Sequence, residues 1–136
     1  MGEDRTSGRR TQTRVARAHR RRFERLVGIA IRHLPAGFAR YLDNVAILTA
    51  DAPSADQRAA AGLADGEVLF GLYEGVPRSQ RSAAYGAVLP DRITLFRWAF
   101  EADGLDDAAA IEEIRRTIIH EVGHHVGFGE ERLRGV

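Results

Sequence analysis

The last third of the sequence contains a long apolar repeat that constrains the fold more than any other feature. Five aliphatic side chains follow one another at steps of three or four residues: Ile111, Ile114, Ile118, Val122 and Val126. This spacing places all five on one face of an α-helix, which must be buried against the remainder of the chain. Asp106 or Asp107 can cap the first turn of this helix, and Gly127 follows its last apolar residue.

Three shorter segments ahead of this helix have the composition of β-strands. They are rich in aliphatic, β-branched and aromatic residues and comprise residues 44–50, 67–75 and 92–98. Residues 51–66 and 76–91 join them, and the Gly, Pro and Asp in these two segments predict loops. The sequence therefore predicts three strands before the C-terminal helix.

A second helical pattern precedes the strands. Apolar side chains recur at helical spacing from Phe23 to Leu34 until Pro35 closes the pattern, and a shorter helix is expected from Phe38 to Leu42. The order helix, strand, strand, strand, helix predicts a small α+β domain in which helices pack on a sheet.

Residues 1–22 differ sharply from the remainder of the chain. They carry eight arginines against two acids, a net charge of +6, whereas residues 23–136 carry a net charge of −5. Apart from Val15 and a few alanines this segment is polar, so it cannot bury enough surface to offset its ordering entropy. We expect a disordered basic tail over residues 1–22, which aids solubility or binds a polyanion weakly, and a folded domain over residues 23–136.

Composition excludes several kinds of chemistry. The chain has no cysteine, so disulfides, zinc thiolates and thiol nucleophiles are ruled out. No segment approaches the roughly 18 consecutive apolar residues of a membrane span, and the N-terminus lacks the apolar part of a secretory signal. These observations predict a cytoplasmic protein without a membrane partner.

Three of the five histidines lie within six positions of the predicted C-terminal helix, in the sequence HEVGHH. His120 and His124 are four residues apart, so their Cβ atoms lie about 5–6 Å apart on one helix face. Both imidazoles can then reach a single zinc ion at about 2.0–2.1 Å. Glu121 lies about 100° further round the helix, where a carboxylate can take a proton from a water on the metal without being a ligand.

Other features of this segment bear on whether the histidines bind a metal. Two histidines at this spacing can occur by chance on a surface helix, but here an apolar helix precedes them. Gly127 allows the chain to turn, and Glu130 and Glu131 bring carboxylate oxygens just after the turn. His125 follows the apolar face more closely than the histidine pair, so a structural role or a role in orienting a ligand imidazole is expected for it.

The segment HEVGHHVGFGEERL, from His120, resembles the HExxHxxGxxD motif of the small bacterial zincin-like metallopeptidases, also called minimal metallopeptidases. The likeness extends to FERLV, NVAI, LFGLYEGVPRSQRS and LPDRITLFR, and so covers nearly all of residues 23–134. The resemblance implies a compact zincin-like fold with a small mixed sheet of about three to four strands and an active-site helix at the C-terminus. It also implies a zinc ion, and a peptide or protein as substrate.

When the residue roles of the family motif are carried over position by position, the resemblance implies that His120 and His124 are zinc ligands, that Glu121 is the general base and that Gly127 is the turn glycine. The aspartate at the end of the family motif corresponds to Glu130, which becomes the third expected ligand. Glutamate is one methylene longer than aspartate, and Glu131 is the competing candidate.

The expected activity is therefore zinc-dependent hydrolysis of peptide bonds. The peptide could add to an exposed strand edge, for which residues 92–97 are the candidate, and Tyr85 is a candidate donor to the oxyanion. Two alternatives stay open. One is a metal-dependent nucleic-acid hydrolase, although related sequences of that kind resemble H-G-x-x-H and lack the glutamate. The other is an interaction module in which zinc, closed in by four protein ligands, stabilises the fold.

Overall fold

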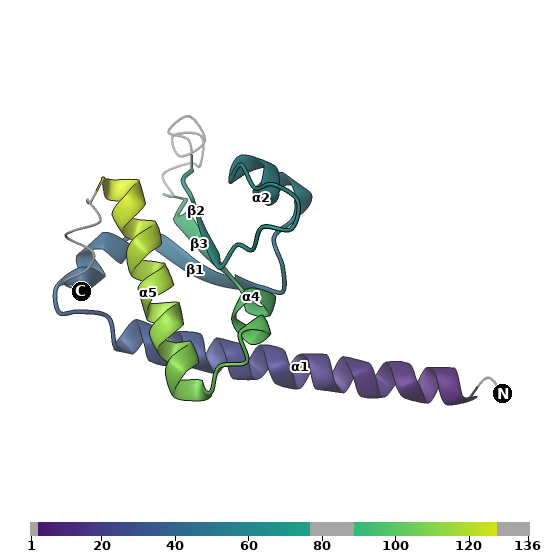
Figure 1. Ribbon diagram of the computed structural model, residues 1–136. Helices are drawn as coiled ribbons and strands as arrows, with labels where there is room; N and C mark the ends of the chain where they lie inside the picture. The colour runs from purple at the N-terminus through teal and green to yellow at the C-terminus, as the bar shows by residue number, and fades with distance from the viewer. Residues whose placement is uncertain (1–2, 77–88, 128–136) are drawn as a thin grey trace.

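The computed structural model describes residues 3–76 and 89–127, which form a small sheet packed against long helices (Figure 1). The described elements are, in chain order, α1 (Glu3–Arg32), the 3-10 helix η1 (Phe38–Leu42), β1 (Val45–Ala50), α2 (Ala55–Ala60), β2 (Gly71–Glu74), β3 (Asp91–Phe96), α4 (Arg97–Ala102) and α5 (Asp107–Val126). The predicted α+β class is confirmed. Among the described residues, none of the helices has the length and apolar character needed to cross a bilayer.

Strand β3 lies at the centre of the sheet that the described residues form. The strand order is β1-β3-β2, with β1 parallel to β3 and β2 antiparallel to it, so the sheet is mixed as expected. The prediction that residues 92–97 form an exposed edge is wrong, because β3 is paired along both sides. Its last four residues are all buried, which shows that both faces of this strand are covered. Strands β1 and β2 are the outer strands of this sheet, one on each side of β3.

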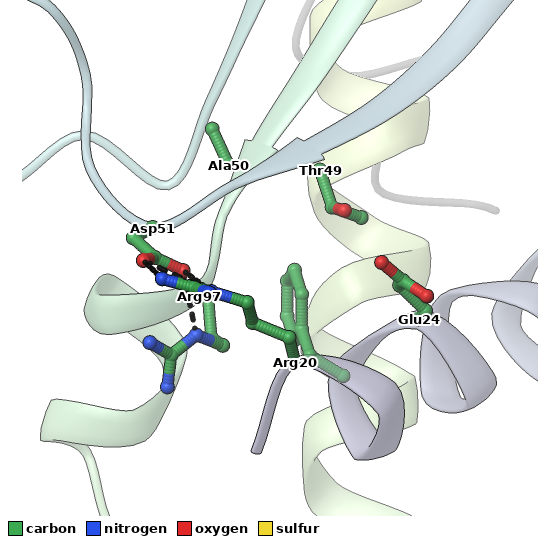
Figure 2. Close-up of a pocket in the computed structure, with 7 residues that line it drawn as sticks. Arg20, Glu24, Thr49, Ala50, Asp51 and Arg97 are labelled. Carbon is green, nitrogen blue, oxygen red and sulfur yellow. Dashed lines mark hydrogen bonds and ion pairs between the residues drawn. The ribbon is translucent and has the colours of Figure 1, made fainter. Parts of the chain in front are cut away.

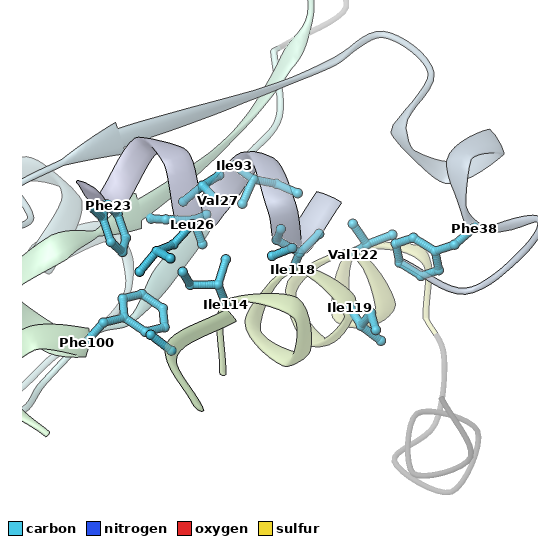
Figure 3. Close-up of a cluster of buried hydrophobic side chains, with 13 residues drawn as sticks. Phe23, Leu26, Val27, Phe38, Ile93, Phe100, Ile114, Ile118, Ile119 and Val122 are labelled. Carbon is cyan, nitrogen blue, oxygen red and sulfur yellow. The ribbon is translucent and has the colours of Figure 1, made fainter. Parts of the chain in front are cut away.

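The core forms where α5 crosses α1 and the sheet (Figure 3). From α5 it receives Ile114, Ile118 and Val122, each with no measurable exposure. The side chains that cover them come from α1, η1, β3 and α4, and include Phe23, Leu26, Val27, Ala30, Phe38, Ile93, Leu95 and Phe100. The predicted apolar face of α5 is therefore confirmed for most of its length, although Val126, at the C-terminal end, remains 43% exposed.

Both ends of α5 agree with the sequence. The side chain of Asp106 caps the helix by accepting a hydrogen bond of 2.8 Å from the Ala109 amide. Gly127 ends it in the left-handed conformation at φ 80°, a backbone geometry that favours glycine. The amide of Gly127 donates to the carbonyl of Gly123, so the chain leaves the helix directly after the histidine cluster.

Two short helices were not expected. Helix α2 lies in the segment predicted as a loop, where Ser54 and Gln57 form a reciprocal capping box: Gln57 N donates to Ser54 Oγ at 3.1 Å, and Ser54 N donates to Gln57 Oε1 at 3.0 Å. The S-x-x-Q spacing that encodes this cap is visible in the sequence. Helix α4 begins at Arg97, so Arg97 and Trp98 are helical and do not extend β3 as predicted.

The arginine-rich segment is helical from Glu3 onward, whereas the expected division into a tail over residues 1–22 and a domain over residues 23–136 stays a prediction. Helix α1 is continuous through Arg32, and Figure 1 shows its N-terminal half extending beyond the sheet. Residues 23–32 supply a packed stretch that overcomes the cost of nucleating a helix. The helix can then continue toward the N-terminus, because Arg and Ala both have high helix propensity.

A carboxylate after β1 joins α1 to the sheet (Figure 2). Asp51 accepts hydrogen bonds from Arg20 at 2.7 Å and from Arg97 at 2.9 Å, and Arg97 also donates to Glu101 at 2.8 Å. Arg97 is nearly buried, with 7% of its side chain exposed, so its charge requires these partners. The hydrogen bonds from Arg20 and then from Arg97 lower the pKa of Asp51 from 3.8 to about 2.

Replacing Asp51 by asparagine tests this cluster. A lowered pKa in the folded state means that the carboxylate stabilises the fold above pH 4 and that this contribution is lost as the pH falls toward 2. We expect Asp51→Asn to lower the free energy of unfolding at pH 7 by about 1–2 kcal/mol, allowing for solvent screening of a partly exposed pair. Urea unfolding from pH 7 to pH 2 should show the difference from wild type shrinking below pH 4. A difference that stays constant with pH would contradict the role of this charge.

Candidate active site

Helix α5 presents His120 and His124 on one side, as their spacing predicts. Their ring centroids lie 6.3 Å apart and their planes are inclined by 48°. His120 is half-buried and His124 is exposed. Two imidazoles that share a zinc ion at about 2.0–2.1 Å have ring centres roughly 5–6 Å apart, so small side-chain rotations suffice to accommodate the ion. The pair therefore fits zinc in both donor chemistry and separation.

The carboxylate of Glu121 points to the sheet. Its Oε2 accepts a hydrogen bond of 3.2 Å from the backbone N–H of Tyr73 in β2. Burial raises the pKa of Glu121, while the Tyr73 amide and the two neighbouring imidazoles of His124 and His120 act in the opposite direction. Glu121 thus lies beside the histidine pair with one oxygen held by a fixed donor.

The expected third ligand falls outside the described residues. Glu130 and Glu131 both lie beyond Gly127, the last residue that the structure describes, and Tyr85 lies in the other gap. Among the side chains of residues 8–76 and 89–127, no set of three His, Asp or Glu is arranged to hold a metal ion. Among those residues, Glu121 therefore does not complete a site with His120 and His124.

Tyr73 organises this end of α5, although nothing in the sequence analysis singled it out. Besides its backbone contact with Glu121, its hydroxyl donates to Asp91 Oδ2 at 2.7 Å. Its ring stacks on His125, with centroids 3.9 Å apart and planes inclined by 15°. His125 Nε2 lies 3.8 Å from Asp91 Oδ2, which places His125 in a structural cluster, in line with the role expected for it. The sequence signal that could have indicated this place for Tyr73 is the strand alternation, because Gly71 and Tyr73 are two residues apart and so lie on one face of the strand.

A groove of about 390 Å³ runs between β2 and α5. The residues that line it come from the segment before and into β2 and from one side of α5: Val68, Leu69, Phe70, Gly71, Glu113, Arg116, Thr117, His120 and Glu121. His120 and Glu121 are thus part of its wall. Since Phe96 N donates to Phe70 O, the alternation of an antiparallel ladder turns the backbone groups of Gly71 and Tyr73 away from β3. The contact between Tyr73 N and Glu121 agrees with that orientation.

Gly71 sets how closely β2 approaches α5. A Cβ atom at this position would lie 2.8 Å from Thr117 Cγ2, closer than real Cβ contacts, and 3.3 Å from Leu95 Cδ2, which is a tight contact. A larger residue here would force the Thr117 side chain or the strand to shift, so glycine fits the close approach of β2 and α5 best. This close approach keeps the Tyr73 amide within reach of Glu121.

Comparison with known proteins identifies the family that the chain resembles. The family model described as zincin-like metallopeptidase matches residues 42–136. Among solved structures, a conserved hypothetical protein from Thermo thermophilus is 28% identical over 83% of this chain and 94% of that chain, with a TM-score of 0.47. A search of the curated proteins finds no match.

Two glycine-to-alanine substitutions test the β2–α5 contact. Gly71→Ala should lower the free energy of unfolding by about 1–3 kcal/mol, because the added methyl group overfills the contact with Thr117. Gly28→Ala is the matched control: it lies inside α1 with nothing within 4 Å of the new Cβ. Alanine there should stabilise the protein by about 0.5–1 kcal/mol through its higher helix propensity. Thermal or urea unfolding measures both, and equal effects would contradict the steric argument.

Proposed function

This chain belongs to the zincin-like metallopeptidase family, and we propose that it is a zinc-dependent peptidase with Glu121 as general base. His120, His124 and Glu130 are the proposed metal ligands. The observation that carries this proposal is the arrangement of two imidazoles on one side of α5 beside a partly buried carboxylate at the wall of an open groove.

The donor set suits a catalytic zinc site. Two imidazoles and one carboxylate make three protein ligands, which leaves a fourth position for water or substrate. Zinc, when bound, supplies Lewis acidity that makes water a stronger acid and polarises a carbonyl group. The remaining chemistry, the movement of protons, falls to residues of the chain itself.

Glu121 performs that proton transfer in the proposed mechanism. Its Oε2 is held by the Tyr73 amide, so we assign Oε1 as the oxygen that accepts a proton from the attacking water. The same carboxyl group then delivers the proton to the amine nitrogen that leaves the cleaved peptide. The hydrogen bond from β2 fixes the orientation of the carboxylate while this exchange takes place.

The proposed substrate is an extended peptide that lies in the groove along the outer edge of β2. The backbone groups of Gly71 and Tyr73 face away from β3, which is the arrangement that strand addition requires. The Tyr73 N–H is held by Glu121, so the groups proposed to pair with the peptide are the N–H and C=O of Gly71 and the C=O of Tyr73. This edge takes the place of residues 92–97, the edge expected from the sequence, because those residues lie largely in the central strand. Arg116 and Glu113 at the wall add charges of both signs that can contribute to side-chain preference.

The substitution Glu121→Gln tests whether Glu121 is the general base or a metal ligand. We expect the variant to keep about one zinc per chain and to lose about 10²–10⁴-fold in peptide hydrolysis, the range for loss of a general base. Glu24→Gln is the matched control, because Glu24 is an exposed glutamate on α1 and does not line the groove. Elemental analysis and cleavage of a fluorogenic peptide mixture give the two readouts. Loss of zinc from Glu121→Gln would show that Glu121 is a ligand.

The third ligand is tested by a pair of neighbouring substitutions. Glu130→Ala should weaken zinc binding much more than Glu131→Ala, because Glu130 occupies the position of the aspartate in the family motif. Competition with a chromogenic chelator measures both affinities at one pH. Equal losses, or a larger loss for Glu131→Ala, would mean that the alignment with the family motif is displaced in this chain.

A further inference from the structure

Five arginines form a straight row along α1. Arg10, Arg14, Arg17, Arg21 and Arg25 follow one another at steps of four, three, four and four residues. Steps of three and four keep residues on one helix face, so these side chains lie one beyond another along the axis. All five are exposed. We call this set the arginine row.

The arginine row lies opposite the face of α1 that packs on the domain. Phe23 and Val27 are buried, and each follows a member of the row by two residues, which is about 200° round the helix. The domain therefore covers one side of α1 and leaves the row on the other side. Figure 1 shows that the N-terminal half of the helix also extends past the sheet, so this half of the row stands clear of the domain.

The charges of the row are not neutralised within the described part of the chain. Arg20 and Arg22, which lie off the row, form ion pairs with Asp51 and Asp107. Among the side chains of residues 8–76 and 89–127, no carboxylate pairs with any of the five row arginines. Residues 8–22 also contain no acid of their own. Arg20 and Arg22 thus pair with carboxylates of the domain, whereas the row arginines can bind an external anion.

We propose that the arginine row binds the phosphate backbone of double-stranded DNA. The helix holds the row straight over about 22 Å from Arg10 to Arg25, at a rise of about 1.5 Å per residue. Duplex DNA presents a phosphate charge about every 1.7 Å of its axis, so several phosphates lie within that length. Arginine forms bidentate hydrogen bonds with phosphate, and a rigid helix avoids the entropic cost of ordering a free tail.

Other anionic surfaces fit the row less well. Residues 8–22 offer only Val15 and small side chains, so this half of α1 has no apolar face to enter a lipid interface. The same residues include no Phe, Tyr or Trp on which unpaired bases could stack. The major groove of duplex RNA is deep and narrow, whereas that of DNA is wide enough to admit a whole helix, so a row of arginines held on a helix approaches the phosphates beside the groove more easily in DNA.

Salt-dependent binding to a 20-base-pair duplex, followed by fluorescence anisotropy, tests the proposal in the full-length chain. Arg14→Gln with Arg17→Gln removes two row charges and keeps good helix formers. The slope of log K against log salt should become shallower by about 2, since each phosphate contact contributes about 0.9, and affinity at low salt should fall by about tenfold or more. Arg40→Gln with Arg92→Gln is the charge-matched control away from α1, and should leave the slope unchanged.

A second double variant separates charge from helix structure. Arg14→Lys with Arg17→Lys keeps both charges, so it should retain the wild-type slope. The proposal is overturned if the control pair weakens binding as much as the row pair. It is also overturned if the wild type binds vesicles containing about one third phosphatidylserine, or polyglutamate, more tightly than the duplex at equal salt, because the partner would then be a membrane or an acidic protein.

Discussion

The burial of one face of α5 is the interaction on which the rest of the structure depends. Ile114, Ile118 and Val122 are fully buried against α1 and the sheet. Removing each such side chain from water contributes about 1.5–3 kcal/mol, which is enough to fix the rotation of the helix about its axis. Once that rotation is fixed, His120 and Glu121 must face the groove beside β2. The orientation of the candidate site is therefore a consequence of core packing.

The short strand β2 connects the core to the candidate active site. β2 is only four residues long, yet its residue Tyr73 contacts Glu121, His125 and Asp91 through its backbone, ring and hydroxyl. These contacts are possible because Gly71 lets the strand lie almost against Thr117 of α5. A bulkier residue there would separate the strand from the helix, and the amide that orients the carboxylate would move away with it.

Arginine serves two purposes in this molecule, and the position of each arginine relative to the domain decides which. Arg97 is nearly buried, so Asp51 and Glu101 must satisfy its charge, and the resulting cluster connects the end of β1 to α4 and, through Arg20, to α1. The arginines on the outer face of α1 are exposed and need no partner for folding. The same residue type is structural on one side of the helix and available for binding on the other.

The sequence by itself determined the features that depend on local spacing: the apolar face of α5, its Asp106 cap and Gly127 end, strand β1, and the placement of His120, Glu121 and His124 along one helix. These follow from helical and strand periodicity and from cap chemistry, which act over a few residues. The tertiary structure alone decided that β3 is central and that β1 and β2 lie on either side of it, because strand pairing depends on partners distant in sequence. It also decided that residues 3–22 continue α1, since a helix packed at one end can extend where an isolated basic segment would not. The place of Tyr73 was decided in the same way: 48 residues separate it from Glu121, and only the packing of β2 on α5 brings the two together.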